Sequence, residues 1–129
     1  VYLTRLENDL VELLSASIDG TLDKIQLNWS KMASVCVVMA SAGYPGAYAR
    51  GKPITGLTEA GQMANTKVFH AGTARAGNQI VTNGGRVLGV TAWGETLKVA
   101  QAGAYAALGK IHFEGAHFRG DIADKAVQR

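Results

Sequence analysis

The stretch from Val68 to Gly94 constrains the fold more than any other part of this chain of 129 residues. It reads VFHAGTARAGNQIVTNGGRVLGVTAWG, so short apolar runs alternate with residues that favour turns. Asn83-Gly84-Gly85 tolerates the positive φ angles of a tight turn, and the runs on either side of it, over 79–82 and 86–92, have the composition of strands. The stretch therefore predicts an antiparallel hairpin, preceded by a short strand over 67–71.

A second strand signal lies upstream of the hairpin. Val35 to Ala40 is a continuous apolar run rich in β-branched residues, which is typical of a strand buried on both faces. Gly43-Tyr44-Pro45-Gly46 follows it and has the composition of a turn. A central strand is therefore expected to lead into a loop whose root is fixed.

Two segments have apolar residues at the spacing of an amphipathic helix. The first runs from Arg5 to Ser17, where Thr4 and Glu7 form a capping-box pattern and Gly20 supplies a stop. The second runs from Glu95 to Leu108 and presents a face of small residues suited to close packing on a sheet. Together with the strands, these segments predict the α+β class, with two long helices on a mostly antiparallel sheet.

Weaker patterns complete one predicted domain. Val1 to Leu3 have the composition of the end of a strand, Thr58 could cap a short helix within 55–64, and Ile111 and Phe113 suggest a short strand. The resulting plan has a linker strand end and the first helix in 1–20, a sheet with its hairpin in 33–93, and the second helix in 94–110. A C-terminal segment follows in 111–129, with a final turn or brief helix over 118–125.

The composition is that of an ordinary globular protein. Apolar residues make up 47% of the chain and charged residues 18%, which excludes the low hydrophobicity of a disordered protein. No apolar run approaches the roughly 20 residues that a membrane helix needs, and no signal segment opens the chain. The single cysteine, Cys36, cannot form an internal disulfide and lies in an apolar run, which indicates a core residue in a reducing compartment. We therefore expect a soluble, cytoplasmic protein.

Charge and spacing argue against further classes of partner. The formal net charge is +3, but the basic residues are scattered from Arg5 to Arg129 without a cluster, so a nucleic-acid partner is not expected. The glycine-rich segments do not form a phosphate-binding loop, since Gly84-Gly85 precedes a strand rather than a helix. The three histidines lack the spacing of a metal site. Neither a metal ion nor a membrane is expected as a partner.

Four polar side chains are candidates for contact with a substrate, and none has a catalytic partner in the sequence. Tyr44 and Lys52 lie in the loop after the central strand, although turn formation alone also explains that loop. His70 lies on a short strand and is either a structural group or a group that faces a neighbouring domain. Arg86 opens the return strand, where its guanidinium could bind a phosphate or carboxylate, or could pair with an acidic residue across the sheet.

Several blocks of the sequence occur together, and in the same order, in one known family. They are VVMASAGYPGAY, VFHAGT, NGGRVLGVTA and FRGDI, between Val37 and Ile122. With these blocks the chain resembles the C-terminal domain of the phosphoribosylamine–glycine ligase family, which belongs to the ATP-grasp superfamily. The resemblance extends from about Arg5 to Ile122, and one departure is Thr4, where the family usually has proline.

The resemblance implies a ligase that joins 5-phosphoribosylamine and glycine to give glycinamide ribonucleotide, ADP and phosphate in de novo purine biosynthesis. ATP and magnesium or manganese would be bound by N-terminal and ATP-grasp domains that this chain lacks. The chain would pack against those domains and help to close the active-site cleft, without holding a cofactor or catalysing the reaction alone. Its exposed docking face, including Val1 to Leu3 and the GYPG loop, could also allow self-association.

Two other functions stay open on the residues alone. A free-standing module of the same fold could bind a small anion or another protein, and a folded monomer without an exposed apolar face would favour it. A hydrolase that uses His70 or His117 would need a paired nucleophile and base, which the sequence does not contain in a recognisable arrangement. An exposed apolar patch would instead favour the ligase domain.

Overall fold

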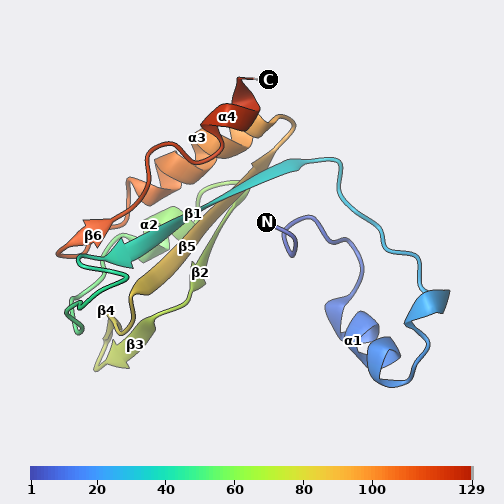
Figure 1. Ribbon diagram of the computed structural model, residues 1–129, viewed down its shortest axis with the longest axis horizontal. Helices are drawn as coiled ribbons and strands as arrows, with labels where there is room; N and C mark the ends of the chain where they lie inside the picture. Colours follow the sequence, from blue (N-terminus) through green and yellow to red (C-terminus); the bar gives the residue numbers. More distant parts are fainter. Residues whose placement is uncertain (129) are drawn as a thin grey trace.

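The computed structural model describes residues 1–128, and these fall into two parts (Figure 1). Residues 1–32 form an N-terminal arm that carries helix α1 (Leu10–Ile18). Residues 33–128 form the body, in which a four-stranded sheet packs against helix α3 (Leu97–Leu108). In Figure 1 the arm extends to one side, so α1 lies away from the sheet and from α3.

The main sheet of the body is antiparallel throughout. Its strand order is β2 (Thr66–His70), β5 (Arg86–Gly94), β1 (Ala33–Ser41) and β6 (Ala116–His117). Each neighbouring pair is antiparallel, and β1 and β5 pair along most of their length. Because β6 comes from the C-terminal segment, the sheet extends beyond the range expected for it. The α+β class is confirmed, and so are the strands predicted over 35–40, 67–71 and 86–92.

The prediction of a hairpin that turns at Asn83-Gly84-Gly85 is wrong. β4 (Gln79–Thr82) pairs with β3 (Thr73–Ala76) in a separate two-stranded sheet, and the turn between them contains Gly77 at a φ of 59°. β5 pairs with β1 and β2 instead of with β4. Gly84 instead allows its backbone to pass close to that of Gly72. A Cβ on Gly84 would lie 2.9 Å from the Cα of Gly72, so the two chain segments cross where neither carries a side chain.

The core lies between one face of the main sheet and α3. Val37 on the sheet and Ala100 and Ala104 on the helix have no exposed surface. Small residues let the helix approach closely, since a Cβ on Gly103 would lie 3.1 Å from that of Ala92. Full burial of a side chain such as Val37 contributes roughly 1.5–3 kcal/mol. The second predicted helix, which packs small residues on the sheet, is confirmed.

Helix α1 begins later than predicted. Its N-cap is Asp9, whose carboxylate accepts hydrogen bonds from two backbone N–H groups of the first turn, so the capping box at Thr4 is wrong. Gly20, at a φ of 67°, follows the end of the helix as predicted. The Thr4 hydroxyl instead lies 2.9 Å from the hydroxyl of Ser34, which joins the arm to β1 of the body.

The arm packs mainly on itself. The 3-10 helix η1 (Leu22–Lys24) contacts α1, and α1 spans nine residues. The prediction of two long helices on the sheet is therefore wrong for α1. Val1 to Leu3 do not form a strand, and they line a shallow hollow together with Cys36 and Thr91 of the sheet.

The second face of the main sheet, which we call the outer face, has no helix over it within residues 1–128. Val38 is 43% exposed and Phe69 is 36% exposed on this face, whereas the neighbouring Val37 points into the core. The prediction that the central strand is buried on both faces is therefore wrong in this chain. The strand is apolar on both sides, but within residues 1–128 only one side has a full partner.

The short helix α2 (Leu57–Gly61) lacks the cap that was predicted for it. Its N-cap is Gly56, in the left-handed conformation, and Thr58 lies inside the helix. A Cβ on Gly56 would overlap the carbonyl group of Lys110, so glycine is required there by both conformation and space. The capping prediction failed because this tertiary contact determines where the helix begins.

The C-terminal segment is more irregular than predicted. Ile111 and Phe113 are buried, but instead of a strand the segment forms an isolated bridge between Thr55 and His112. The brief helix predicted over 118–125 is present as α4 (Asp124–Val127), which begins later and overlaps only the end of the predicted range. No helix within the described residues is both long enough and apolar enough to cross a membrane.

Candidate functional site

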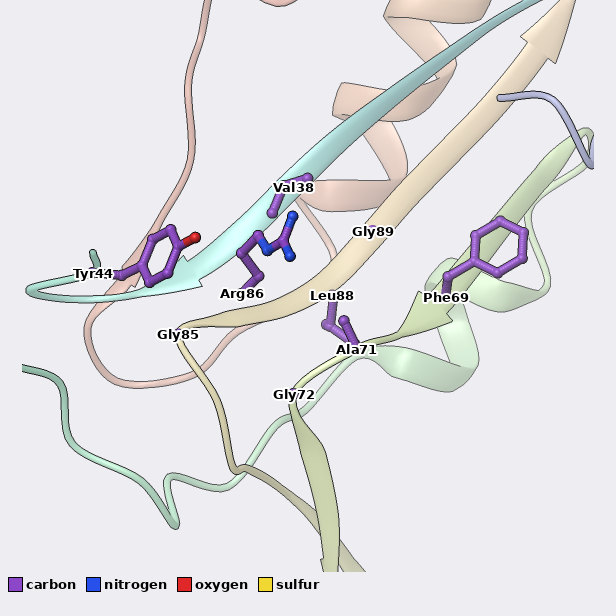
Figure 2. A pocket seen from close by; sticks show the side chains of 9 residues that line it. All are labelled: Val38, Tyr44, Phe69, Ala71, Gly72, Gly85, Arg86, Leu88 and Gly89. Carbon is purple, nitrogen blue, oxygen red and sulfur yellow. The ribbon is translucent and has the colours of Figure 1, made fainter. Parts of the chain in front are cut away.

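A hollow of about 590 Å³ opens on the outer face, at the end of the sheet where β1 stops and β5 starts (Figure 2). We call it the outer hollow. Val38 and Tyr44 form one wall, Phe69 lies on the opposite side, and β5 forms the floor from Gly85 to Gly89. The lining is completed by Ala71, Gly72, Arg86 and Leu88.

The floor of the hollow is bare because of the strand register. Val38 of β1 and Phe69 of β2 both lie opposite Gly89 of β5. Directly paired residues project from the same face of a sheet, so the glycine leaves a strip of backbone between two apolar side chains. A Cβ on Gly89 would lie 3.3 Å from the sulfur of Cys36, which borders the strip. The outer hollow is therefore an apolar groove.

Tyr44 closes one end of the hollow from the loop after β1. Its ring lies over Gly85, where a Cβ would overlap the ring atoms. The ring also meets Tyr48 edge to face, with 6.4 Å between the centroids, and the Arg50 guanidinium lies 5.7 Å from the Tyr48 ring centroid. The loop thus presents two aromatic rings and a cation in a row.

Ser41, the last residue of β1, joins this loop to the start of β5. Its hydroxyl donates a hydrogen bond to the carbonyl oxygen of Gly84 at 3.0 Å, and its backbone N–H donates to that of Gly85 at 2.8 Å. Ser41 is 6% exposed, so both bonds are shielded from water. It was not among the candidates from the sequence, because a serine at the end of an apolar run signals only the end of the strand.

Arg86 supplies the charge of the outer hollow. In Figure 2 its side chain lies across β1 toward Val38, and the Tyr44 hydroxyl points to the same side. The residue is exposed, and among residues 1–128 no carboxylate pairs with it. The alternative of an acidic partner across the sheet is therefore not realised there. The guanidinium keeps its planar set of donors for a carboxylate or a phosphate.

The other two candidates lie outside the hollow and have local partners. The Lys52 ammonium is 2.7 Å from a carboxylate oxygen of Glu114. His70 is exposed at the end of β2, and its Nδ1 lies 3.0 Å from the hydroxyl of Thr73. The structure therefore brings Tyr44 and Arg86 together and leaves Lys52 and His70 elsewhere.

The clearest electrostatic effect in the body is in the C-terminal segment, at Arg119 and Asp121. Arg119 Nε donates a hydrogen bond to Asp121 Oδ1 at 2.8 Å. This hydrogen bonding is the main cause that lowers the pKa of the Asp121 carboxyl below its ordinary value, and it raises the pKa of Arg119. Both side chains are exposed, so water screens the pair. Within residues 1–128, no three His, Cys, Asp or Glu side chains are placed to share a metal ion.

Fold and hollow together define an α+β domain in which a helix covers one sheet face, while within residues 1–128 the other face is covered only in part. The sequence profile of a family described as "Phosphoribosylglycinamide synthetase, C domain" matches residues 34–125, which is most of the body. The chain belongs to this family, and the resemblance carried by its sequence blocks is confirmed. The whole arm lies outside the matched range.

Relatives match over nearly the whole chain. The phosphoribosylamine–glycine ligase of Rhodopirellula baltica is 48% identical over 126 residues, which cover 97% of this chain and 29% of that protein. The protein of the same name from Rhizobium meliloti is 49% identical over 129 residues, which cover 100% of this chain and 30% of that protein. The chain thus spans less than a third of the length of the relatives that it matches.

A related solved structure has the same fold. The crystal structure of the phosphoribosylamine–glycine ligase from Thermotoga maritima matches with a TM-score of 0.60 and 42% sequence identity. The match covers 68% of this chain and 21% of that chain. The α+β assignment therefore has support from a solved relative as well as from the strands and helices of the body.

Proposed function

We propose that this chain acts as the C-terminal domain of a cytoplasmic phosphoribosylamine–glycine ligase. That enzyme would join 5-phosphoribosylamine and glycine to form glycinamide ribonucleotide, with conversion of ATP to ADP and phosphate, in de novo purine biosynthesis. The observation that carries the proposal is the 48% and 49% identity, over at least 97% of this chain, to proteins of that name. ATP and magnesium or manganese would bind to the N-terminal and ATP-grasp domains, and residues 1–129 would act as one C-terminal unit.

The outer hollow is the proposed point of contact with substrate. 5-Phosphoribosylamine carries a phosphate and glycine carries a carboxylate, so each offers an anion that a guanidinium binds through two parallel hydrogen bonds. Arg86 would bind one of these anions, and Tyr44 would form the wall beside it. Lys52 and His70 would join them only after leaving Glu114 and Thr73.

In this proposal the residues of the hollow bind and orient, and none of them reacts. The glycine carboxylate is activated as an acyl phosphate, which the amine of 5-phosphoribosylamine attacks with release of phosphate. A cation that fixes one reactant anion reduces the entropy cost of bringing two reactants together. Val38 and Phe69 would exclude water from that anion, and a lower local dielectric strengthens its pairing with Arg86.

The exposed apolar residues support a role within a larger protein. On the arm, Val11, Leu14 and Ile18 are 71%, 57% and 86% exposed. On the outer face, Val38 and Phe69 are also open to solvent. Monomeric proteins rarely leave contiguous apolar areas uncovered, which disfavours a free-standing module. Other domains of the same enzyme would cover these areas, and the isolated chain would self-associate through them.

Complementation in trans tests the proposal. The chain is mixed with the Rhizobium meliloti ligase shortened by the 30% that this chain matches. ADP formation is then measured with ATP, magnesium, glycine and 5-phosphoribosylamine. We expect no turnover from either part alone and clear turnover from the mixture. Turnover by the chain alone, or a mixture that neither associates nor turns over, would contradict the proposal.

A matched pair of variants locates the contact between the two parts. Phe69→Asp places a charge on the outer face, whereas Val99→Asp places one on α3, where the native side chain is 55% exposed. Burying an unpaired charge is costly, so Phe69→Asp should weaken association about 10-fold or more, and Val99→Asp should leave it unchanged. A chain that binds inorganic phosphate without associating with the shortened ligase would favour a free-standing anion-binding module instead.

A further inference from the structure

The backbone conformation of Gly85 does not explain why this residue is glycine. Its φ lies outside the positive range, unlike that of Gly77, so a residue with a side chain could adopt the same conformation. Space is what excludes a side chain. The three atoms nearest to a Cβ on Gly85 all belong to the Tyr44 ring, and the Cβ would overlap them. A substitution at Gly85 therefore displaces the Tyr44 side chain first.

Ser41 is hydrogen-bonded to both sides of the contact between Gly85 and the Tyr44 ring. Its hydrogen bonds to the carbonyl oxygens of Gly84 and Gly85 fix the segment before Arg86 against the end of β1. The backbone N–H of Tyr44 donates to the carbonyl oxygen of Ser41 at 3.1 Å. The ring and the backbone beneath it thus share one anchor, so the ring can leave Gly85 only by rotating its side chain.

We infer that Gly85 is a positioning residue of the outer hollow. By leaving space for the Tyr44 ring, it holds that ring as a wall of the hollow that Arg86 also lines, and so sets the room for an anionic ligand group. An alanine at this position turns the ring away or pushes it into the hollow, and either movement changes how a ligand meets Arg86. The identity of the ligand rests on the proposed function, whereas the placement of Tyr44 rests on this chain alone.

At two other glycines near the hollow, a Cβ would meet backbone atoms rather than a side chain. A Cβ on Gly72 would lie 2.5 Å from the carbonyl oxygen of Arg86, and one on Gly84 would lie 2.9 Å from the Cα of Gly72. Substitutions there displace backbone and so disturb the fold itself. Gly61, in α2, has no atom within 4 Å of such a Cβ, so Gly61→Ala is a matched control for the change from glycine to alanine.

Binding of ribose 5-phosphate to the full chain tests the inference, because this probe carries a sugar phosphate without the reactive amine. The affinity is measured by NMR, from the Arg86 side-chain resonance, for the wild type, Gly85→Ala, Tyr44→Ala, the double variant and Gly61→Ala. Gly85→Ala should weaken binding about 10-fold, as expected for one impaired hydrogen bond to a charged group. In the Tyr44→Ala background the same change should alter the affinity less than about 2-fold. Gly61→Ala should leave the affinity unchanged.

Each remaining outcome overturns the inference. An equal loss from Gly85→Ala with and without the Tyr44 ring would mean that the effect does not pass through the ring. An unchanged affinity in Gly85→Ala, or no binding by the wild type, also overturns it. The nuclear Overhauser contact between the Tyr44 ring and residue 85 reports the position of the ring, and amide spectra that otherwise match the wild type show that the variants are folded.

The outcome is separable from that of the proposed function. Coupling between Gly85→Ala and Tyr44→Ala, together with a mixture in trans that neither associates nor forms product, supports the positioning role and rejects the proposed ligase function. An active mixture without coupling supports the ligase domain and rejects the positioning role.

Discussion

The arm and the body contain the same kinds of apolar residue, but apolar residues without any exposed surface occur only in the body. In the body, Val37, Val87 and Val90 have no exposed surface. In the arm, Val11 is 71% exposed and Ile18 is 86% exposed. The body supplies its own partner, because α3 lies across one face of the sheet, whereas α1 packs on η1. Amphipathic spacing therefore specifies a helix without specifying what will cover it.

The connection between the two regions is slight. The Thr4 and Ser34 hydroxyls are hydrogen-bonded at 2.9 Å, and Val1 to Leu3 share a shallow hollow with Thr91. The Thr91 hydroxyl is buried without a hydrogen-bond partner in the described part of the chain. A group of this kind costs roughly 1–3 kcal/mol, which offsets part of what the arm contributes. The arm should therefore be separable from the body with a small loss of stability.

Truncation of apolar side chains should give the largest contrast between the two regions. Met39→Ala in the body removes a side chain from a residue that is 1% exposed, and the resulting cavity should lower the free energy of unfolding by about 2–5 kcal/mol. Leu14→Ala in the arm, at a residue that is 57% exposed, should change it by less than about 0.5 kcal/mol. Urea titration measures both values. Equal losses would mean that arm and body are stabilised as one unit.

Removal of residues 1–31 should have the next largest effect. The body then loses the hydrogen bond at Ser34 and the cover beside Cys36, while the Thr91 hydroxyl gains access to water. The free energy of unfolding should fall by about 1–2 kcal/mol, and calorimetry should still show one cooperative transition. If that transition disappears, the arm is an integral part of the fold of the body.

The N-caps of α1 and α3 allow the same kind of interaction to be removed from the arm and from the body. The Asp9 carboxylate caps α1, and the Thr96 hydroxyl accepts a hydrogen bond from the first turn of α3 at 3.2 Å. Replacement of either by alanine should remove about 1 kcal/mol from its own helix. Thr96→Ala should lower the free energy of global unfolding, whereas Asp9→Ala should speed amide exchange within α1 alone.

The matched control for the caps is Thr58→Ala, because the Thr58 side chain lies inside α2 and does not cap it. Thr58→Ala should change neither the free energy of global unfolding nor the amide exchange within α1. A global loss of stability from Asp9→Ala would break the distinction between the two regions, since it would mean that α1 unfolds together with the sheet.

The smallest effect is expected in the body, at the exposed Arg119–Asp121 pair. Hydrogen bonding from Arg119 lowers the pKa of Asp121 in the folded chain. The stabilisation of the folded chain by this pair is therefore present above the ordinary carboxyl pKa of about 3.9. It is lost as the pH falls through the lowered pKa of Asp121. Arg119→Gln should raise the Asp121 pKa toward the ordinary value, as measured by NMR titration. The difference in melting temperature between variant and wild type should shrink as the pH falls below that value.

Local patterns predicted the elements whose residues carry their own signal. Helix α3 and strands β1, β2, β4 and β5 lie close to the predicted ranges. Strand pairing was not predictable, because the only apolar residues of β3 (Thr73-Ala74-Arg75-Ala76) are alanines, which are depleted in strands, and yet β3 is the partner of β4. The glycines at 84 and 85 therefore resembled a hairpin turn, although each is required by contact with a distant residue.

The site was predictable only in part, for the same reason. Tyr44 and Arg86 could be selected as a loop residue and a strand-end residue, but their meeting depends on the pairing of β1 with β5. In the sequence, Lys52 and His70 are equivalent to them, and only the fold places Glu114 beside Lys52 and Thr73 beside His70. Ser41 carries no local signal beyond the end of a strand, and Gly85 signals a turn, because its contact with the Tyr44 ring is visible only in the fold.

Strand β6 (Ala116–His117) covers only a small part of the edge of β1. It pairs with β1 only at Ala40 and Ser41. Along the same edge, from Ala33 to Met39, no strand pairs with β1 within residues 1–128. Free main-chain donors and acceptors on an apolar strand are a template for strand addition by a second molecule. Concentrated samples are therefore open to edge-to-edge aggregation, and a chain that ends before Ala116 would be more so.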